Sequence, residues 1–406
     1  MRILVINSGS SSIKYRLFDA RDWRDLANGS LTRIGEADSR FQQDWLDPDG
    51  GPRQHLDQAP IADHHQGLTR MLAALTGTGV LGRLDELAAI GHRVVHGGER
   101  FQAPTPIDGE VLAGIQAMIP LAPLHNPANL EGIRVALDLF PGVPQVAVFD
   151  TAFHQTMAPQ AFRYALPEDL YRSHGVRRYG FHGSSHAYVS RRAAEFLGLP
   201  PEQVNLISLH LGNGASATAV RSGRSVNTSM GMTPLEGLVM GTRCGDLDPA
   251  MPFFLCRELG YDLAAVEKLL NQRGGLLGLA GVNDMREIHR LAASGDAQAG
   301  LARDIFVHRL RKYLGAYWVE LGRVDALVFT GGIGENDAWT RQQTCADLEN
   351  LGLRLDPAAN AAPDRRERRI SSSDSPVAVL VIPTNEELEI ARQTWSQVGP
   401  GDYWGP

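Results

Sequence analysis

The amino-acid sequence predicts an α/β protein of two domains, each built on a mixed β-sheet flanked by helices. Its 406 residues are 43% hydrophobic and 21% charged, which is more chain than one core comfortably organises and too balanced for a disordered protein. Strand-like apolar runs alternate with helix-like stretches, and this alternation favours the α/β class. Two similar strand–turn–strand units, one in each half, indicate that a single domain plan occurs twice.

The two repeated units have the pattern of β-hairpins. In the first, residues 3–18 form two apolar runs on either side of the small polar segment 7–12. In the second, residues 206–220 surround the segment 212–216, which consists of glycine, asparagine, alanine and serine. Apolar runs closed by small turn residues are typical of hairpins.

The remaining elements follow from local spacing. A strand is predicted over residues 326–330, followed by the glycine-rich turn 331–336 at the start of a helix. Apolar residues at helical spacing predict helices within residues 68–75, 130–139, 185–197 and 300–321. Two segments rich in turn-forming and charged residues are predicted to be surface loops, residues 34–60 and 357–376.

Charge and cysteine usage exclude several classes of partner. The formal net charge of −7 provides no basic field for nucleic acid or an anionic membrane, so we expect a small-molecule substrate. The N-terminal residues run directly into a strand with no long apolar segment, which predicts a cytoplasmic protein without signal peptide or membrane anchor. Three cysteines without zinc-like or CxxC spacing predict three free thiols, at Cys244, Cys256 and Cys345.

The two hairpin turns have a composition that suits a phosphate chain. Small residues expose backbone N–H groups, and serine adds hydroxyl donors. Neither turn is a Walker A loop, because no GxxxxGK[ST] pattern occurs. Either turn alone is equally typical of an ordinary tight turn, so only their combination indicates a nucleotide gripped from two sides.

A second group of polar residues lies among apolar and glycine-rich neighbours. Arg93 and Arg243 are close to glycines, where a guanidinium can fork onto a carboxylate or a phosphoryl group, although each could instead be a surface ion-pair partner. His182 and His186 stand at helical spacing. Zinc ligation by this pair is disfavoured, because no further cysteine or carboxylate stands at ligand spacing.

A set of segments spread from residue 5 to residue 392 resembles the acetate and propionate kinases, in the order of that family. These segments are VINSGSSSIKY, GHRVVHGG, PLAPLHNP, VFDTAFH, RRYGFHGSSH, SLHLGNGAS, NTSMGMTPLEGLVMGTRCGDLDP, GVNDMRE, FTGGIGEN and VIPTNEELEIAR. The resemblance implies the duplicated fold shared by acetate kinase, sugar kinases, Hsp70 and actin, with the active site in the cleft between two domains. The expected domains are residues 1–150, completed by about 387–406, and residues 151–386. Residues 21–60 are not recognisably similar to the family.

The resemblance also assigns roles to individual residues. It implies catalytic roles for Asp150, His182 and Arg243. It implies that the substrate carboxylate binds Arg93 and that the acyl group meets Val95, Leu124, Phe181 and Pro234. It implies a metal site at Asn7 and Glu386. It implies nucleotide contacts at Lys14, His210, Leu211, Gly212, Asn213, Gly214, Asp284, Met285, Arg286, Gly332, Ile333, Gly334, Glu335 and Asn336. Without the resemblance, the four acyl-pocket residues would be interpreted as ordinary core.

The reaction implied is reversible, direct in-line transfer of the γ-phosphoryl group of ATP to acetate, giving acetyl phosphate and ADP. Such transfer depends on positioning and charge neutralisation, which two arginines, a histidine and Mg²⁺ (with Mn²⁺ as an alternative ion) can supply. A carboxylic acid with a pKa near 4 is already ionised at neutral pH, so we interpret Asp150 as an orienting or metal-water residue rather than a proton acceptor.

Two other functions are alternatives to acetate phosphorylation. Propionate kinase uses the same chemistry, and one methylene contributes only about 1–3 kcal/mol of discrimination. An Hsp70-like ATPase fits badly, because only about twenty residues follow Glu386 and leave no room for a peptide-binding domain. The family resemblance further suggests a homodimer.

Overall fold

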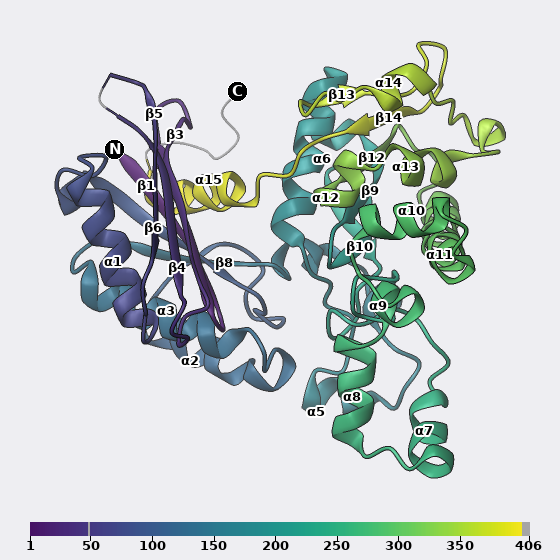
Figure 1. The fold of residues 1–406 in the computed structure, drawn as a ribbon, viewed down its shortest axis with the longest axis horizontal. Helices are drawn as coiled ribbons and strands as arrows, with labels where there is room; N and C mark the ends of the chain where they lie inside the picture. The colour runs from purple at the N-terminus through teal and green to yellow at the C-terminus, as the bar shows by residue number, and fades with distance from the viewer. Residues whose placement is uncertain (48, 400–406) are drawn as a thin grey trace. The chain divides into compact units, whose positions relative to one another are not determined.

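A computed structural model describes residues 1–47 and 49–399 of the chain (Figure 1). The chain divides into two compact units. The first comprises Met1–Ala152 together with the chain from Asn385 onward, and the second comprises Phe153–Thr384. No helix within the described ranges is long and apolar enough to cross a membrane.

The first unit contains an eight-stranded mixed sheet with the order β5-β4-β3-β2-β1-β6-β8-β7. Its strands are β1 Arg2–Gly9, β2 Ser12–Asp19, β3 Asp25–Thr32, β4 Arg40–Leu46, β5 Pro52–Gln58, β6 Leu87–Val94, β7 Thr105–Pro106 and β8 Gln145–Phe149. Strands β1, β6 and β8 are parallel, and β2 to β5 extend the sheet by antiparallel hairpins. Its α-helices are α1 His64–Gly77, α2 Gly109–Ala117, α3 Asn126–Leu139 and α15 Glu386–Val398.

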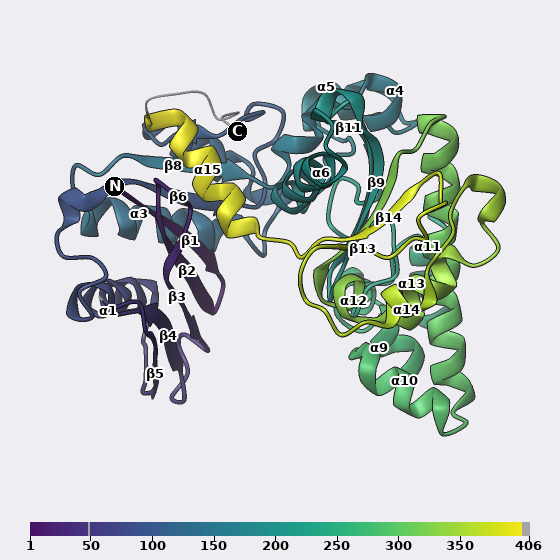
Figure 2. The ribbon, with the colours of Figure 1, turned by 90° about the horizontal axis from the view of Figure 1, so that it is seen from above.

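Alternation along β1 places one apolar layer on each face of this sheet. Leu4 and Ile6 pack in a cluster with residues of α1 and α3. Ile3 and Val5 pack in a second cluster with Ile390 of α15. Figure 2 shows α15, the helix furthest along the chain, lying across the strands of this first sheet. The chain therefore returns to its first unit to cover the second face.

The second unit contains a six-stranded mixed sheet with the order β11-β10-β9-β12-β14-β13. Its strands are β9 Asn205–Leu211, β10 Ala215–Arg221, β11 Arg224–Thr228, β12 Ala326–Thr330, β13 Arg368–Arg369 and β14 Ala378–Val381. Its α-helices are α4 Pro159–Phe162, α5 Glu168–His174, α6 Gly183–Leu197, α7 Met251–Leu259, α8 Leu263–Gln272, α9 Gly275–Ala280, α10 Met285–Ala293, α11 Ala297–Leu321, α12 Gly331–Asn336, α13 Ala338–Cys345 and α14 Pro357–Ala361.

The two sheets repeat one strand plan. The order β3-β2-β1-β6-β8-β7 in the first corresponds to β11-β10-β9-β12-β14-β13 in the second. In both, the central hairpin is antiparallel, the next two strands are parallel and the last strand is antiparallel. The predicted α/β class with mixed sheets is confirmed, and the repeated order explains why the two hairpins look alike in sequence.

Four local predictions need correction. Residues 34–60 are not a surface loop but include β4 and β5 at one side of the sheet. The edge strand β5 buries no side chain and β4 buries only Phe41 and Gln43, so their composition resembles that of a loop. Residues 357–376 include α14 and β13. Residues 331–336 form a helix, not a turn. The first turn is only Ser10 and Ser11, since β1 and β2 pair as far as Gly9 and Ser12.

The predictions of four helices and of three free thiols are confirmed. The four helical stretches predicted from spacing lie within α1, α3, α6 and α11. Cys244, Cys256 and Cys345 are free cysteines, as predicted. Local apolar periodicity was therefore sufficient wherever a helix packs one face on the sheet.

Candidate active site

In the first unit, charged side chains gather where the parallel strands β1, β6 and β8 end. Asn7 lies in the last part of β1, Arg93 near the end of β6, and Asp150 directly after β8. Register aligns Ile6 with His92 and Arg93 with Val148, so the three residues come from neighbouring strand ends. Open α/β sheets bind ligands at this carboxyl edge.

Arg93 and Asp150 form a buried ion pair with fork geometry. Arg93 Nε donates to both carboxylate oxygens of Asp150 at 3.1 Å, and Nη2 donates to Oδ2 at 2.7 Å. Asp150 is 1% exposed, and the Arg93 side chain is 24% exposed. Burial by itself lowers the pKa of Arg93, but the charges of Asp150 and Glu386 outweigh burial and raise it. The guanidinium is therefore oriented by Asp150 and stays charged.

Glu386 begins α15 and brings a second carboxylate close to this pair. Burial raises the pKa of Glu386 to about 7, and nearby Asp150 adds to the rise while Arg93 and Lys14 oppose it. Within the described chain, no residue donates a hydrogen bond to this half-buried carboxylate. Lys14 stands directly opposite Asn7 in the β1–β2 pair. Asn7 and Glu386 are thus both placed near Lys14, although their sequence numbers differ by nearly the whole chain.

The two first-unit residues that were predicted to meet the acyl group differ in exposure. Val95, just past β6, is 7% exposed, whereas Leu124, in the segment before α3, is 65% exposed. Buried Asn129 of α3 holds this region together: its Oδ1 accepts from Val95 N at 3.0 Å and its Nδ2 donates to Ser8 O at 2.7 Å. Asn129 was not identified from the sequence, and no signal in the helical pattern distinguished it.

In the second unit, the turn between β9 and β10 is a compact three-residue loop. Gly212 N donates to Gly214 O at 3.0 Å, and the loop residue Asn213 accepts from Gly241 N at 2.9 Å. A Cβ on Gly241 would lie 2.0 Å from Asn213 Oδ1, so only glycine allows this approach. The loop is therefore shaped by contacts with the Gly241 region, far along the sequence.

His182 and Arg243 both lie beside Gly214 of this loop. A Cβ on Gly214 would lie 3.4 Å from His182 Nε2 and 3.6 Å from Arg243 Nη1. His182 adopts a left-handed conformation with φ of 56° at the start of α6, which is uncommon outside glycine and marks strained functional positions. Its ring stacks on His210 with centroids 4.3 Å apart. A cation and an imidazole thus flank one turn that exposes backbone N–H groups.

Arg243 has no carboxylate partner in the described part of the chain. Its Nη1 donates to Pro234 O at 3.1 Å and contacts Met240 Sδ at 3.5 Å. Burial lowers the pKa of Arg243. A half-buried guanidinium without a counter-ion is a ready partner for an anionic ligand.

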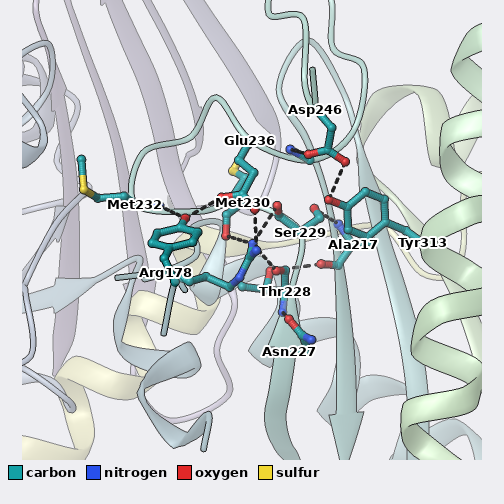
Figure 3. Close-up of polar contacts among 12 residues, drawn as sticks. Arg178, Ala217, Asn227, Thr228, Ser229, Met230, Met232, Glu236, Asp246 and Tyr313 are labelled. Carbon is teal, nitrogen blue, oxygen red and sulfur yellow. Dashed lines mark hydrogen bonds and ion pairs between the residues drawn. The ribbon is translucent and has the colours of Figure 1, made fainter. Parts of the chain in front are cut away.

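A network of buried polar contacts holds the loop that carries Pro234 and Arg243 (Figure 3). Arg178 Nη1 donates to the carbonyls of Thr228, Ser229 and Met230, and its Nη2 forms an ion pair with Glu236. These contacts gather the chain just after β11 around one guanidinium. They give Arg178, the second arginine of the segment RRYGFHG, a structural role that motif spacing alone did not indicate.

The far end of the same loop is held at Asp246 (Figure 3). Asp246 Oδ1 accepts from Gly237 N at 2.7 Å, and its Oδ2 accepts from Tyr313 Oη at 2.9 Å. Arg309 donates to the carbonyls of Gly237 and Asp246. Helix α11 therefore anchors the loop through two side chains, so that Arg243 is supported at both ends of its segment.

A cavity of about 790 Å³ opens at the carboxyl ends of β9, β12 and β14. Pockets for small molecules commonly measure about 300–1,000 Å³, which is room enough for a nucleotide. Most of the predicted adenosine-contacting residues line it, namely Asp284, Met285, Arg286, Gly332, Ile333, Glu335 and Asn336, together with Gly212 and Asn213. Its other lining residues were not predicted from the sequence; they are Asn283, His289, Asp337, Arg365, Arg368 and Pro383.

Glu335 connects two segments of the chain that border this cavity. Its Oε1 accepts from Gly331 N at 2.9 Å and from Thr384 N at 3.2 Å, so it joins the start of α12 to the segment after β14. Gly331 has a φ of 76°, and a Cβ there would lie 2.8 Å from Leu211 O. Glu335 therefore supports the cavity wall from within as well as lining it.

The remaining predicted residues lie around these two centres. Phe181 is 2% exposed next to His182, and Pro234 is half-buried and accepts from Arg243. Gly334, His210 and Leu211 are buried behind the cavity surface. Lys14 is exposed on β2. The candidate residues thus form two sets, one in each unit.

Comparisons with known proteins agree with one another. A family model described as "Acetokinase family" matches residues 2–392. A protein named acetate kinase from Streptomyces avermitilis is 57% identical over 402 residues, covering 99% of this chain and 98% of the relative. A crystal structure of Porphyromonas gingivalis acetate kinase is 43% identical with a TM-score of 0.91, covering 97% of this chain and 99% of that one. A propionate kinase from Francisella tularensis is 43% identical with a TM-score of 0.90 and the same coverage.

Proposed function

The chain belongs to the acetokinase family, which makes it a phosphotransferase, and we propose that it transfers the γ-phosphoryl group of ATP reversibly to acetate. The observation that carries this proposal is the convergence of His182 and Arg243 on Gly214, beside a nucleotide-sized cavity. Donors aimed at a transferring group stabilise the charge that develops on it. We assign the phosphoryl donor to the second unit and the carboxylate acceptor to the first.

Arg93 supplies the carboxylate-binding group. Its Nε and Nη2 are held by Asp150, whereas no described residue accepts from its Nη1, which is left to donate to an anionic acceptor. The acceptor needs no base, because acetate is ionised above a pKa of about 4. Asp150 therefore acts as the residue that orients Arg93, and Val95 and Leu124 of the first unit border the methyl group.

The residues present fit a magnesium ion. Asn7 and Glu386 offer an amide oxygen and a carboxylate, and the carboxylate of Glu386 has no hydrogen-bond donor in the described chain. Mg²⁺ prefers oxygen ligands and usually takes one or two carboxylates plus substrate phosphates. Bound there, Mg²⁺ would neutralise charge on the nucleotide phosphates. Mn²⁺, which also takes oxygen ligands, is the alternative ion.

The nucleotide occupies the cavity of the second unit. Its phosphates meet the loop Gly212–Gly214, which follows His210 and Leu211 at the end of β9 and whose glycines permit close approach. Its adenosine meets the start of α10, at Asp284, Met285 and Arg286, and α12, from Gly332 to Asn336.

The test is a trapping assay. Purified protein with ATP, Mg²⁺ and acetate should form acetyl phosphate, which hydroxylamine converts to a coloured hydroxamate. Absence of product with acetate, but formation with propionate, would replace acetate by propionate as the acceptor. Propionate is the second candidate because the Francisella tularensis propionate kinase is as similar in structure as the acetate kinase. Comparing kcat/KM for both acids decides between them.

We also propose a cytoplasmic homodimer. Helices α7 and α8 expose a run of apolar side chains, with Phe253 64%, Leu259 57% and Leu263 80% exposed. A contiguous exposed apolar patch marks an interaction surface, and a second copy would bury it on both chains. Sedimentation should give a dimer, and Phe253→Asp should shift it toward the monomer.

A further inference from the structure

His186 is buried and belongs to a motif that the proposed function leaves unused. It stands one helical turn after His182 on α6, and both of its ring nitrogens contact serine hydroxyls. Nδ1 lies 2.6 Å from Ser208 Oγ, and Nε2 lies 2.8 Å from Ser216 Oγ. Ser216 Oγ in turn lies 2.8 Å from His182 Nδ1. The four residues form a chain of hydrogen bonds that ends at the His182 ring.

We propose that Ser208, His186 and Ser216 are positioning residues that hold His182 as the tautomer with its proton on Nε2, so that a neutral His182 donates a hydrogen bond to the transferring phosphoryl group. This inference rests on the proposed function for the identity of the group that receives the hydrogen bond. The arrangement of protons follows from the contacts alone.

The proton arrangement can be traced from the buried end. Ser208 is fully buried, and among the described residues its hydroxyl has one partner, His186 Nδ1. Because a buried hydroxyl hydrogen left without an acceptor is costly, Ser208 donates to Nδ1. That nitrogen therefore carries no proton. A neutral His186 then has its proton on Nε2.

The second step passes through Ser216. His186 Nε2–H donates to Ser216 Oγ, and the single hydrogen of Ser216 is free to point to His182 Nδ1. His182 Nδ1 is then an acceptor, and the neutral ring carries its proton on Nε2. Burial, and then the charges of His154 and His210, hold the pKa of His186 well below its usual range, which keeps it neutral.

The donor end of the chain lies beside the phosphate loop. The position of a Cβ on Gly214 is 3.4 Å from His182 Nε2 and 3.6 Å from Arg243 Nη1. A neutral histidine in this state can donate above its own pKa, whereas a ring free to change tautomer would donate from Nε2 only part of the time. His182 can therefore act at neutral and alkaline pH without being charged.

The kinetic test uses Ser216→Ala, with Ser225→Ala as its matched control. Ser225 is likewise a fully buried strand serine, and its Oγ lies 2.9 Å from His154 Nδ1, but it does not contact the His182 ring. Ser216→Ala should lower kcat about tenfold, since one positioned hydrogen bond is lost. In a His182→Ala background the same change should cost less than about twofold, because the chain no longer ends at a donor. Ser225→Ala should leave kcat nearly unchanged in both backgrounds.

The pH profile and a rescue variant sharpen this test. In Ser216→Ala, kcat should fall toward higher pH, and the parent should show no such fall, because the neutral His182 ring is no longer held as one tautomer. His186→Gln, whose amide N–H can still donate to Ser216, should retain more activity than His186→Leu. Equal losses for Ser216→Ala and Ser225→Ala, or a loss that persists without His182, would overturn the proposal.

A spectroscopic measurement separates this inference from the proposed function. NMR of the full-length protein, with isotopic nitrogen in its histidines, should show His182 Nδ1 as an unprotonated acceptor and Nε2 as protonated, with the signal assigned by its loss in His182→Ala. The opposite tautomer would contradict the proposed positions of the protons. A different outcome is that the parent shows the stated tautomer but His182→Ala leaves kcat unchanged. That result would contradict the catalytic role of His182 and would leave the hydrogen-bond chain supported.

Discussion

The two units share one strand plan but present different chemistry at the same strand ends. In the first unit the ends of β6 and β8 carry Arg93 and Asp150, which form a fork-shaped ion pair, with the half-buried Glu386 nearby. In the second unit the ends of β9 and β12 carry glycines, and the side chains beside them are imidazoles and an arginine without a carboxylate partner in the described chain.

Under the proposed function, this difference divides one reaction between the two copies of a duplicated fold. A small carboxylate offers few atoms, so its recognition needs a strong, oriented charge. A nucleotide offers a long phosphate chain and a large base, so its recognition needs exposed backbone N–H groups and a cavity. Substitutions in the first unit should therefore act through charge and acceptor size, and substitutions in the second through backbone shape and transition-state contacts.

The largest effect is expected at Arg243. Arg243→Ala should lower kcat by about 10²–10³ while nucleotide affinity stays nearly intact, because one donor to the transferring group is lost. Steady-state kinetics with a nucleotide-binding measurement will check this. Arg311→Ala is the control, since Arg311 also donates to backbone carbonyls but lies outside the site; it should affect stability and spare kcat. Loss of ATP affinity with turnover preserved would reassign Arg243 to ground-state binding.

A tenfold effect is expected at the carboxylate of the first unit. Glu386→Gln should raise the Mg²⁺ concentration for half-maximal rate about tenfold, equivalent to about 1.4 kcal/mol, because a charged oxygen ligand becomes neutral. Titrating Mg²⁺ at saturating ATP and acetate measures this. Glu387→Gln removes the adjacent carboxylate, which lies 3.8 Å from Arg16, and should change the titration little. Equal shifts in both variants would argue for a general charge effect instead of ligation.

Backbone shape should dominate at Gly331. Gly331→Ala forces a side chain onto a left-handed residue with a φ of 76° and places a Cβ 2.8 Å from Leu211 O. The conformational term alone costs about 1–2 kcal/mol, so we expect a lower free energy of unfolding and a higher KM for ATP. Gly315→Ala on α11, where a Cβ meets nothing within 4 Å, should neither lower the free energy of unfolding nor raise KM for ATP. An unchanged KM in Gly331→Ala would show that the loop tolerates movement.

The smallest effect concerns acceptor size. Val95→Ala should lower KM for propionate and butyrate relative to acetate by about fourfold for each added CH₂ that the new space holds, since each buried CH₂ contributes about 0.8 kcal/mol. Turnover with acetate should change little, because Arg93, His182 and Arg243 are intact. Val94→Ala is the control on the same strand, where the side chain packs in the core, and it should lower stability without changing the order of the acids. An unaltered ranking in Val95→Ala would make Val95 a core residue.

Much of the architecture could be predicted from local pattern. Helices with one apolar face, such as α1 and α6, and the central hairpins were predictable because periodicity and turn residues act over a few positions. The outer strands β4 and β5 were not, since they bury few side chains and their composition resembles that of a loop. The cavity residues Arg365 and Arg368 were missed because they lie in residues 357–376, which were predicted to be a surface loop.

The family, the repeated domain plan and the types of side chain available for phosphoryl transfer can be predicted from the amino-acid sequence, because short motifs encode them. What each side chain does depends on packing in three dimensions. Arg93 and Asp150 are 57 residues apart and meet as an ion pair, and the protons of His186 are placed by Ser208 and Ser216 on two different strands. Charge state, tautomer and orientation depend on neighbours in space, since burial and hydrogen-bond partners are set by packing and not by spacing along the chain.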